Sequence, residues 1–356
     1  MKVLIDRHHH ALLESYLLLM EDRYGWEVFS PYGMEWFHSE TWNFERKFHG
    51  DAVAKQYLVG IWGDTSDPDF VTVADERHPG RTLRGISYEA ALDMQWDLVI
   101  SSLPHNDEGY HRLAEKTGAA FGVQVGNAVQ QSRWDLAEFI LSSSTLPGYG
   151  PEHIGKTFTF NGIPAVMYHQ EFSLDIFHAE WPPAEKASVA SFVNCFAETA
   201  RYPEFVRLAR AYPDEFDWRV FGAYGSAPVD EYAVGNISRV PDVADAMRAT
   251  RIGFHNKTFS DGFGHVVHQW FAIGRPVMGY HRYYALQIAA PLWVEGETSF
   301  DIEGKTDEEV ITIMRRLRDD DGYHQRISEN AAARFRSIVD YDAEAATIHA
   351  LLGGVA

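Results

Sequence analysis

The residues best placed to do chemistry in this chain lie between Lys257 and Gln269. Lys257 carries a positive charge. Asp261 follows four positions later, immediately before Gly262-Phe263-Gly264. A Gly-rich turn before a helix exposes unpaired N–H groups and a partial positive charge, and both suit phosphate. The pattern predicts an anion site at the helix tip, with Lys257 as the candidate for neutralising the phosphate charge.

The same stretch predicts a helix with marked ends. Ser260 or Asp261 is the expected cap, since a short side-chain oxygen accepts the free N–H groups of the first turn. Gly274 suits the left-handed position after the helix, and Pro276 prevents its continuation. On such a helix Asp261 and Gln269 would lie roughly 12 Å apart along the axis and about 80° apart in rotation. That span suits an extended nucleotide diphosphate-sugar; an ordinary capped helix of an α/β protein is the alternative.

The segment resembles the donor-binding signature of a large family of retaining glycosyltransferases with the B-type fold. In that signature Glu-Gly-Phe-Gly leads to a second Glu and then to Gly-x-Pro-Val. Gly262-Phe263-Gly264 and Gly274-Arg275-Pro276-Val277 match, and the two glutamates fall on Asp261 and Gln269. The resemblance implies that Asp261 contacts the donor sugar and Gln269 the ribose hydroxyls. Asp shortens the reach by one methylene group, and Gln keeps the hydrogen bonds but loses the charge.

The resemblance implies an α/β fold with two facing Rossmann-like domains and a cleft between them. Alternating strands and helices favour parallel sheets, and a chain of 356 residues is large for one core. We expect an N-terminal acceptor domain over 1–180, a linker over 181–188, a C-terminal donor domain over 189–335, and a last helix over 336–356 that crosses back to the N-terminal domain.

The hydrophobic pattern predicts most elements of both domains, and residues 31–95 read as an irregular insertion near the acceptor site. The three consecutive aspartates at 319–321 read as a solvated acidic turn. The expected strands are 2–5, 26–29, 96–102, 120–125, 189–196, 218–222 and 251–255, and the expected helices are 12–24, 109–117, 202–212, 242–250, 261–273, 306–318 and 325–352.

Ligands bind at the carboxyl ends of parallel strands, so residues after the strands are the remaining site candidates. A histidine titrates near neutrality and could take the proton of an acceptor hydroxyl. If the enzyme inverts, such a group takes that proton; if it retains, the donor phosphate does. The catalytic candidates are His8, His9, His10, His105 and Asp107, the acceptor-binding candidates Glu35, Trp36 and Asn127, and the further donor-binding candidates Asn194, Ser260 and Phe263.

Composition limits the partners. The net charge of −20 disfavours nonspecific binding to nucleic acid or an anionic membrane. Residues 1–185 hold 13 Lys+Arg against 27 Asp+Glu, which favours an acceptor that is not strongly anionic. Cys195 is the single cysteine, so no internal disulfide can form. With no apolar run of membrane-spanning length, we expect a cytoplasmic protein.

The sequence therefore predicts a glycosyltransferase that moves a hexosyl or pentosyl group from a nucleotide diphosphate-sugar, UDP-sugars included, to a hydroxyl acceptor. The resemblance implies a metal-independent reaction with no cofactor, and the adjacent histidines His8–His10 do not favour a metal site because neighbouring strand residues point to opposite faces. The alternatives are glycosylation of a modified base in phage DNA, which the net charge disfavours, a nucleotide-sugar epimerase or hydrolase, and a non-catalytic nucleotide-sugar-binding protein. A dinucleotide-dependent oxidoreductase is disfavoured because no Gly-x-Gly-x-x-Gly follows the first strand.

Overall fold

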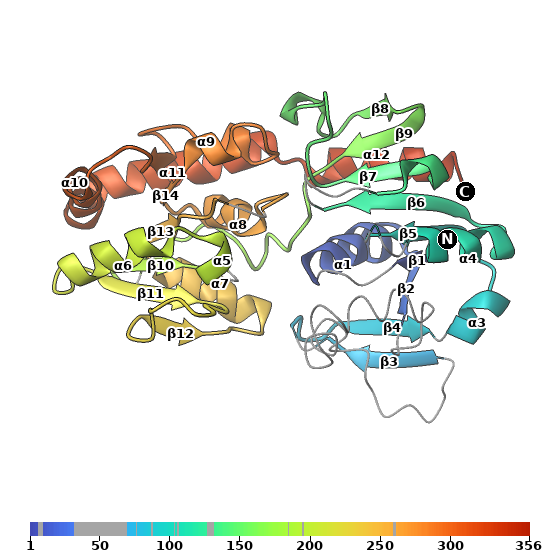
Figure 1. Ribbon diagram of the computed structural model, residues 1–356, viewed down its shortest axis with the longest axis horizontal. Coiled ribbons are helices and arrows are strands. Elements are labelled where there is room, and N and C mark those ends of the chain that lie inside the picture. Colours follow the sequence, from blue (N-terminus) through green and yellow to red (C-terminus); the bar gives the residue numbers. More distant parts are fainter. Residues whose placement is uncertain are drawn as a thin grey trace. The chain divides into compact units, whose positions relative to one another are not determined.

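The chain forms two compact units, which Figure 1 labels by element. Unit 1 comprises Met1–Phe172 and Tyr341–Ala356, and unit 2 comprises Ser173–Asp340. The segment 181–188, which the sequence indicated as a linker, lies inside unit 2 and ends in its first strand. The computed structural model describes residues 1–5, 10–31, 70–75, 77–86, 88–102, 104, 107–126, 132–183, 185–193, 196–258 and 261–356.

The described residues of unit 1 form a nine-stranded sheet in the order β3-β4-β2-β1-β5-β6-β7-β9-β8. The β3–β4 and β8–β9 pairs are antiparallel, and the other pairs are parallel. The strands are β1 (Lys2–Ile5), β2 (Glu27–Pro31), β3 (Phe70–Ala74), β4 (Thr82–Ile86), β5 (Leu98–Ser101), β6 (Ala120–Val125), β7 (Phe139–Ser142), β8 (Thr157–Phe160) and β9 (Ile163–Met167). The helices are α1 (His10–Tyr16), which continues as a π-helical turn (Leu17–Asp22), α3 (Tyr88–Asp93), α4 (Asp107–Thr117) and α12 (Tyr341–Gly353), with short 3-10 turns at Trp134–Leu136 and Pro151–His153.

Helices cover both faces of the unit 1 sheet, which explains why its central strands are mostly apolar and buried. Leu13 of α1 and Ile348 of α12 belong to one buried cluster, and Tyr110 of α4 belongs to the cluster on the other face. The C-terminal helix is also tied to this sheet by a buried carboxylate. Glu344 accepts hydrogen bonds from the main-chain N–H of His169 and from its Nδ1, both at 2.7 Å.

Two expectations for these segments are wrong. The described part of 31–95 is not irregular, because it forms β3, β4 and α3. The single closing helix expected over 325–352 is two helices, since α11 ends at Ile338 and α12 begins at Tyr341. The helix ends there because Val339 takes an extended conformation, and the chain passes from unit 2 to unit 1 after Asp340.

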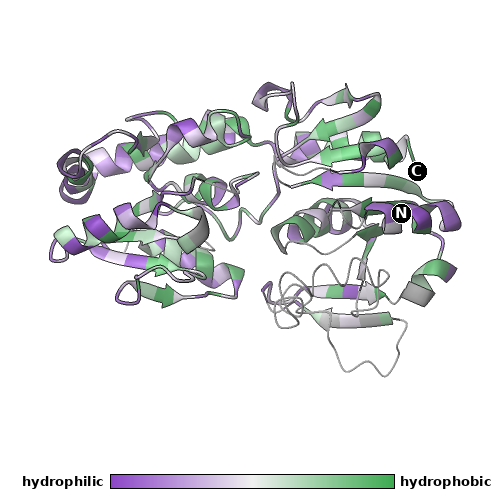
Figure 2. Ribbon diagram, in the orientation of Figure 1, coloured by the Kyte–Doolittle hydropathy of each residue, from purple (hydrophilic) through white to green (hydrophobic). Residues whose placement is uncertain are grey.

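The described residues of unit 2 form a six-stranded parallel sheet in the order β12-β11-β10-β13-β14-β15. Hydrophobic and hydrophilic residues alternate along the covering helices α10 and α11, as Figure 2 shows. The strands are β10 (Ser188–Ser191), β11 (Asp217–Phe221), β12 (Ala233–Gly235), β13 (Ile252–His255), β14 (Val277–Gly279) and β15 (Ser299–Asp301). The helices are α5 (Phe196–Thr199), α6 (Tyr202–Ala211), α7 (Val240–Ala249), α8 (His265–Ile273), α9 (His281–Tyr284), α10 (Asp307–Asp319) and α11 (Asp321–Ile338), with a 3-10 turn at Ala290–Leu292.

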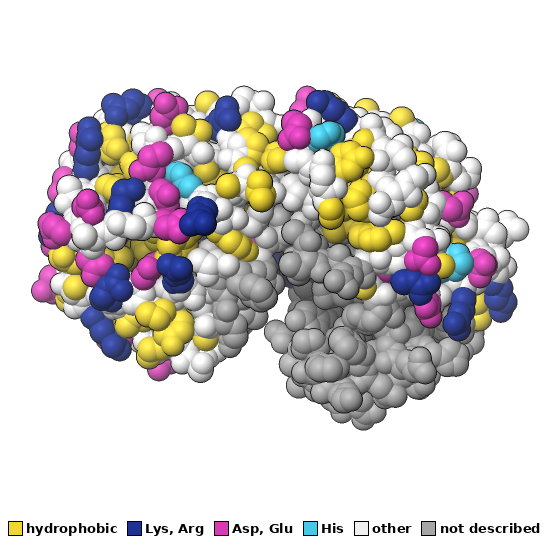
Figure 3. Space-filling model, turned by 45° about the horizontal axis from the view of Figure 1, so that its top comes forward, with side chains coloured by type: hydrophobic (Ala, Val, Ile, Leu, Met, Phe, Trp, Pro, Cys, Tyr) yellow, Lys and Arg dark blue, Asp and Glu magenta, His cyan; other side chains and the backbone are white. Residues whose placement is uncertain are grey.

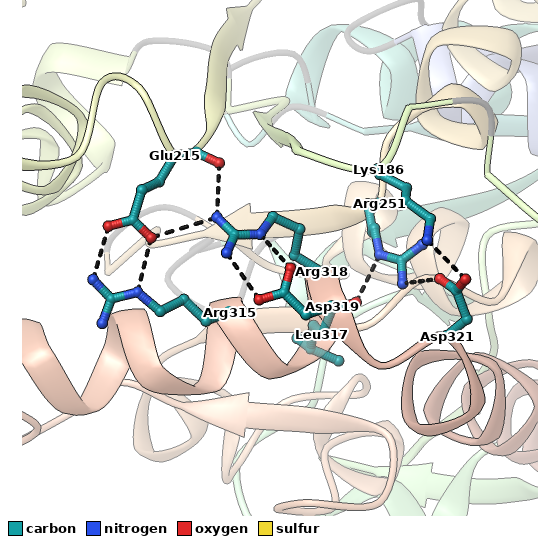
Figure 4. Close-up of polar contacts among 8 residues, drawn as sticks. All are labelled: Lys186, Glu215, Arg251, Arg315, Leu317, Arg318, Asp319 and Asp321. Atoms are coloured by element: carbon teal, nitrogen blue, oxygen red, sulfur yellow. Dashed lines mark hydrogen bonds and ion pairs between the residues drawn. The ribbon is translucent and has the colours of Figure 1, made fainter.

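A buried arginine fixes the start of β13. Arg251 is 1% exposed, and its guanidinium donates to the carbonyl of Leu317 at 2.6 Å and to Asp321 at 2.8 Å (Figure 4). Asp321 also accepts from Lys186 at 2.8 Å, and the neighbouring carboxylate of Asp320 caps α11. The three aspartates at 319–321 are exposed where α10 ends and α11 begins, which confirms the expected solvated acidic turn, and two of their carboxylates also anchor β13 and α11.

A second buried arginine, Arg275, fixes the end of α8. Its guanidinium donates to the main-chain carbonyls of Thr250 at 2.9 Å, Glu180 at 2.9 Å and Arg248 at 2.6 Å. The strand β13 and the helix α8 are thus held at their far ends, and the residues that join them lie between two fixed elements. On the surface of unit 2, acidic and basic side chains are interspersed over the face that Figure 3 shows at left.

Candidate functional site

The order of strands identifies one end of the unit 2 sheet. From β10 the chain continues outward to β11 and β12, and then returns to β13, β14 and β15 on the other side of β10. The carboxyl ends of β10 and β13 therefore lie at the point where the winding direction reverses, which is where doubly wound sheets bind ligands. Lys257 and Asp261 both fall between β13 and α8, at this switch point.

The carboxylate of Asp261 is the centre of a polar cluster. Its Oδ1 lies 3.5 Å from the Nζ of Lys257, while its Oδ2 accepts a hydrogen bond of 2.6 Å from the hydroxyl of Tyr284. The Nε2 of His255, the last residue of β13, lies 3.4 Å from the same Oδ2. The main-chain N–H of Asp261 donates to the hydroxyl oxygen of Tyr283 at 2.8 Å. The Asp261 and Lys257 side chains are 14% and 16% exposed, so the cluster is mostly buried but still accessible to solvent.

The hydrogen bonds determine the tautomer of His255. Tyr284 has one hydroxyl proton, which it gives to Asp261, so the contact of 2.7 Å between His255 Nε2 and Tyr284 requires Nε2 to donate. Burial lowers the pKa of His255 below its ordinary 6.5, although Asp261 opposes the shift. The imidazole is therefore neutral, with its proton on Nε2 and a buried, unprotonated Nδ1 that has no partner among the described residues.

Asp261 is ionised. Burial alone would raise its pKa, but the charge of Lys257 and the hydrogen bonds from His255 and Tyr284 outweigh burial and hold the pKa well below the ordinary 3.8. Burial and the adjacent Asp261 raise the pKa of Tyr284 far above 10. The site thus combines one carboxylate and one ammonium group with neutral hydrogen-bonding partners.

Lys257 is positioned by its backbone. It forms an antiparallel bridge with Ala200, immediately before α6. The preceding residue, Asn256, accepts from the N–H of Arg201 through its carbonyl at 3.0 Å and donates from Nδ2 to the carbonyl of Arg201 at 2.9 Å. The segment after β13 is therefore paired with the segment that leads into α6.

The start of α8 differs from the expectation. The helix begins at His265, and its cap is Gly264 in the left-handed conformation, with φ of 77° and no side-chain cap bond, so the expected cap at Ser260 or Asp261 is wrong. A Cβ on Gly264 would make an ordinary contact of 3.4 Å with the Cβ of Ala289, so the left-handed backbone rather than lack of space favours glycine here. Asp261 lies on the turn before the helix, and the spacing expected for two residues of one helix does not apply. Gly274 ends α8 in the left-handed conformation, which confirms that expectation.

Three further residues of the predicted signature lie at this turn or on α8. The ring of Phe263 stacks on His268 with centroids 4.0 Å apart, and it is buried together with Gly262. Gln269 lies on α8 and is 6% exposed. Its carboxamide can both donate and accept, so it could hydrogen-bond a ligand that reaches α8.

The unit 1 candidates are less completely described. Asp107 begins α4 after β5 and is fully buried; its Oδ1 accepts from the hydroxyl of Ser101 at 2.6 Å and its Oδ2 from the N–H of Arg133 at 2.7 Å. This geometry fits a structural role. His10 is the first residue of α1, and its side chain is not described. The candidates His8, His9, Glu35, Trp36, His105, Asn127, Asn194 and Ser260 lie outside the described residues.

Sequence reasoning missed three residues of the cluster: His255, Tyr283 and Tyr284. His255 carried a signal, since it ends a predicted strand at the correct edge of the sheet. The two tyrosines follow Asp261 by more than twenty positions, and only the return of the chain through β14 and α9 brings them to it. Over the described ranges, no group of three His, Cys, Asp or Glu side chains could hold a metal ion, and no helix is long and apolar enough to cross a membrane.

Comparison with known proteins supports the architecture. No protein-family profile matches the chain, and neither does any curated sequence. Among solved structures, HepE from Anabaena in complex with UDP-glucose is 12% identical over 99% of this chain and 100% of that chain, with a TM-score of 0.63. Sucrose-phosphate synthase from Thermosynechococcus elongatus is 13% identical over 99% and 98% of the two chains, with a TM-score of 0.60. A glycosyltransferase from Rickettsia africae is 11% identical over the same shares, also with a TM-score of 0.60. The chain therefore has the glycosyltransferase-B fold, as the sequence predicted.

Proposed function

We propose that this protein is a glycosyltransferase that transfers a sugar from a nucleotide diphosphate-sugar to a hydroxyl acceptor. The observation that carries the proposal is the polar cluster at the unit 2 switch point. There the ammonium group of Lys257 lies beside the carboxylate of Asp261, at the edge where this fold binds its ligands, and the helix that carries Gln269 follows the same turn. Fold alone does not establish activity, so the site supplies the argument.

In the proposed complex, the ammonium of Lys257 binds the diphosphate and stabilises the negative charge that develops when it leaves. Gln269 on α8 hydrogen-bonds the ribose, and Asp261 lies next to the donor sugar. Gly262, Phe263 and Gly264 contribute the turn that approaches the phosphates. Ser260 and Asn194 are further candidate donor contacts from the sequence. HepE was solved with UDP and with UDP-glucose, which supports a UDP-sugar as the first donor to test.

The acceptor belongs to unit 1 in this proposal. The carboxyl ends of β1 and β5 meet at the switch point of that sheet. In the sequence, His8–His10 come after β1 and His105 comes after β5. One of these histidines would accept the hydroxyl proton in an inverting reaction. The excess of acidic residues in 1–185 supports a neutral or cationic acceptor.

The proposal is tested by the melting temperature of the protein with UDP, GDP, ADP and dTDP and their sugar conjugates, with and without EDTA. A ligand that binds only the folded state raises the melting temperature by mass action. We expect one nucleotide to stabilise the wild type and to lose that effect in Lys257→Ala. Stabilisation that survives EDTA supports metal independence.

Product analysis then separates the alternatives. Transfer to an added hydroxyl acceptor supports the glycosyltransferase, whereas donor consumption without an acceptor indicates a hydrolase or an epimerase. Binding without turnover indicates a nucleotide-sugar-binding protein. No shift with any nucleotide contradicts the donor site.

A further inference from the structure

We infer that Asp261 is the resident counter-ion of Lys257, held in place by Tyr284 and His255, and that a donor diphosphate competes with it for the ammonium group. The inference rests on the proposed function, because it describes how the same site admits its donor. It gives Asp261 a role that differs from direct contact with the donor sugar.

The two oxygens of Asp261 serve different partners. Oδ2 accepts from the hydroxyl of Tyr284 at 2.6 Å, and His255 Nε2 lies 3.4 Å from it, so this oxygen is fixed. Oδ1 faces Lys257 Nζ at 3.5 Å, and this carboxylate is the partner of the ammonium among the described residues. The carboxylate is therefore anchored on one side and presented to the lysine on the other.

The Asp261–Lys257 ion pair is loose. Charge-assisted hydrogen bonds between ammonium and carboxylate groups are usually about 2.7–2.9 Å long, and the observed separation is 3.5 Å. A phosphate oxygen that approaches closer than Oδ1 gains a stronger interaction with Lys257. Asp261 does not then become an isolated charge, because Tyr284 and His255 continue to stabilise it.

The competition gives Asp261 an effect on affinity that opposes the usual expectation for a binding residue. Its negative charge repels a diphosphate, and it occupies the cation that the diphosphate needs. Asp261→Asn removes both effects and keeps the size of the side chain. We expect this variant to bind UDP about three- to tenfold more tightly than the wild type.

Tyr284 has the role of a positioning residue. Without its hydroxyl, Oδ2 loses its strongest partner and the carboxylate can turn both oxygens toward Lys257. Tyr284→Phe should therefore tighten the internal ion pair and weaken UDP binding by about threefold. This effect should disappear in the Asp261→Asn background, because no carboxylate remains to be positioned. A residue that only stabilises the fold would lower affinity in both backgrounds.

The experiment measures binding of UDP and of inorganic pyrophosphate by isothermal titration calorimetry, on the full chain. The variants are Asp261→Asn, Tyr284→Phe and the double variant, with Asp261→Ser as a second neutral replacement if the asparagine variant does not fold. Asp307→Asn is the matched control, since it removes another carboxylate of unit 2, one paired with Arg207 at 2.7 Å. We expect this control to bind as the wild type does.

Tighter binding in Asp261→Asn, weaker binding in Tyr284→Phe, and a double variant that matches Asp261→Asn support the inference. If the wild type binds UDP and Asp261→Asn binds it with the same or lower affinity, the inference is overturned, but the proposed donor site still stands. Absence of UDP and pyrophosphate binding in both the wild type and Asp261→Asn overturns the donor site and the competition together.

Discussion

Asp107 and Asp261 lie at equivalent points of the two sheets. Each follows a strand next to the switch point; Asp107 is the first residue of α4, and Asp261 lies on the turn before α8. Asp107 is fully buried and gives both oxygens to groups of its own unit, the hydroxyl of Ser101 and the N–H of Arg133. Asp261 is 14% exposed, and one of its oxygens faces a lysine at 3.5 Å.

The comparison teaches that position at a switch point does not make an acidic residue functional. Asp107 has its hydrogen bonds satisfied and lies at the N-terminus of α4, where a negative charge is stabilised. Asp261 lies beside the ammonium group of Lys257, to which an anionic ligand could bind. Loss of Asp107 should therefore reduce stability, while changes around Asp261 should alter ligand binding.

The largest effect that tests this difference is expected from Lys257→Ala. Removal of the ammonium leaves the diphosphate without its main cation, and UDP affinity should fall by about tenfold or more. Calorimetric titration of UDP measures the loss. Lys186→Ala is the matched control, because Lys186 pairs with Asp321 at 2.8 Å and is 64% exposed. Equal losses in the two variants would mean that Lys257 acts only through the net charge of the protein.

Asp107→Asn provides the stability side of the comparison. The amide can keep its oxygen on the Arg133 N–H and turn its NH2 group to Ser101, whose hydroxyl must then accept instead of donate. Both contacts lose the negative charge of their partner, which costs about 1–3 kcal/mol of unfolding free energy. Urea denaturation measures the cost, and UDP affinity should stay unchanged. A lower transfer rate at unchanged stability would instead place Asp107 in the reaction.

The sequence was sufficient where the signals are local. The spacing from Arg251 to Val277 predicted a strand, a Gly-rich turn, a helix and a second strand, and the structure has β13, α8 and β14 there. Gly274 ends the helix in the left-handed conformation because a residue without Cβ reaches it most easily. The resemblance to B-type glycosyltransferases added the two-unit architecture, which composition alone could not supply.

The sequence was insufficient where long-range contacts decide. The N-cap of α8 is Gly264 and not Ser260 or Asp261, because the carboxylate of Asp261 contacts Tyr284 and Lys257 instead of the N–H groups of the helix. The spacing of residues within one short segment contains no information about Tyr284, which the chain brings to the site only after β14. The role of Asp107 was also hidden, since its partner Arg133 lies more than twenty positions away.

Two histidines extend the comparison to pH. In unit 1, the Nδ1 of His78 lies 2.8 Å from Asp75 and its Nε2 lies 3.0 Å from Glu14. Burial opposes the charged form, but the two carboxylates outweigh it and raise the pKa of His78 from 6.5 to about 9. In unit 2, burial lowers the pKa of His255. The first histidine is therefore charged at neutral pH and the second is neutral.

The signs of the two pKa shifts predict opposite responses to pH. The stabilisation by His78 is fully present below about pH 6.5 and is lost as pH rises through about 9. His78→Gln should remove roughly 1–3 kcal/mol at neutral pH and much less above the folded pKa. His255 should instead favour unfolding as pH falls below 6.5, because the unfolded chain then gains its proton first. Urea denaturation across this range measures both. A His78→Gln penalty that does not change with pH would rule out a charged His78.

The smallest effect is expected from Gln269→Ala, which tests whether the unit 2 site has separate parts for phosphate and ribose. The side chain is 6% exposed, so its truncation leaves a small cavity, and urea denaturation measures the stability cost of that cavity separately. UDP affinity should fall by about three- to tenfold, since one or two hydrogen bonds to the ribose are lost. Pyrophosphate affinity should not change, because pyrophosphate has no ribose. Equal losses for the two ligands would instead place Gln269 at the phosphate end of the proposed site, with Lys257.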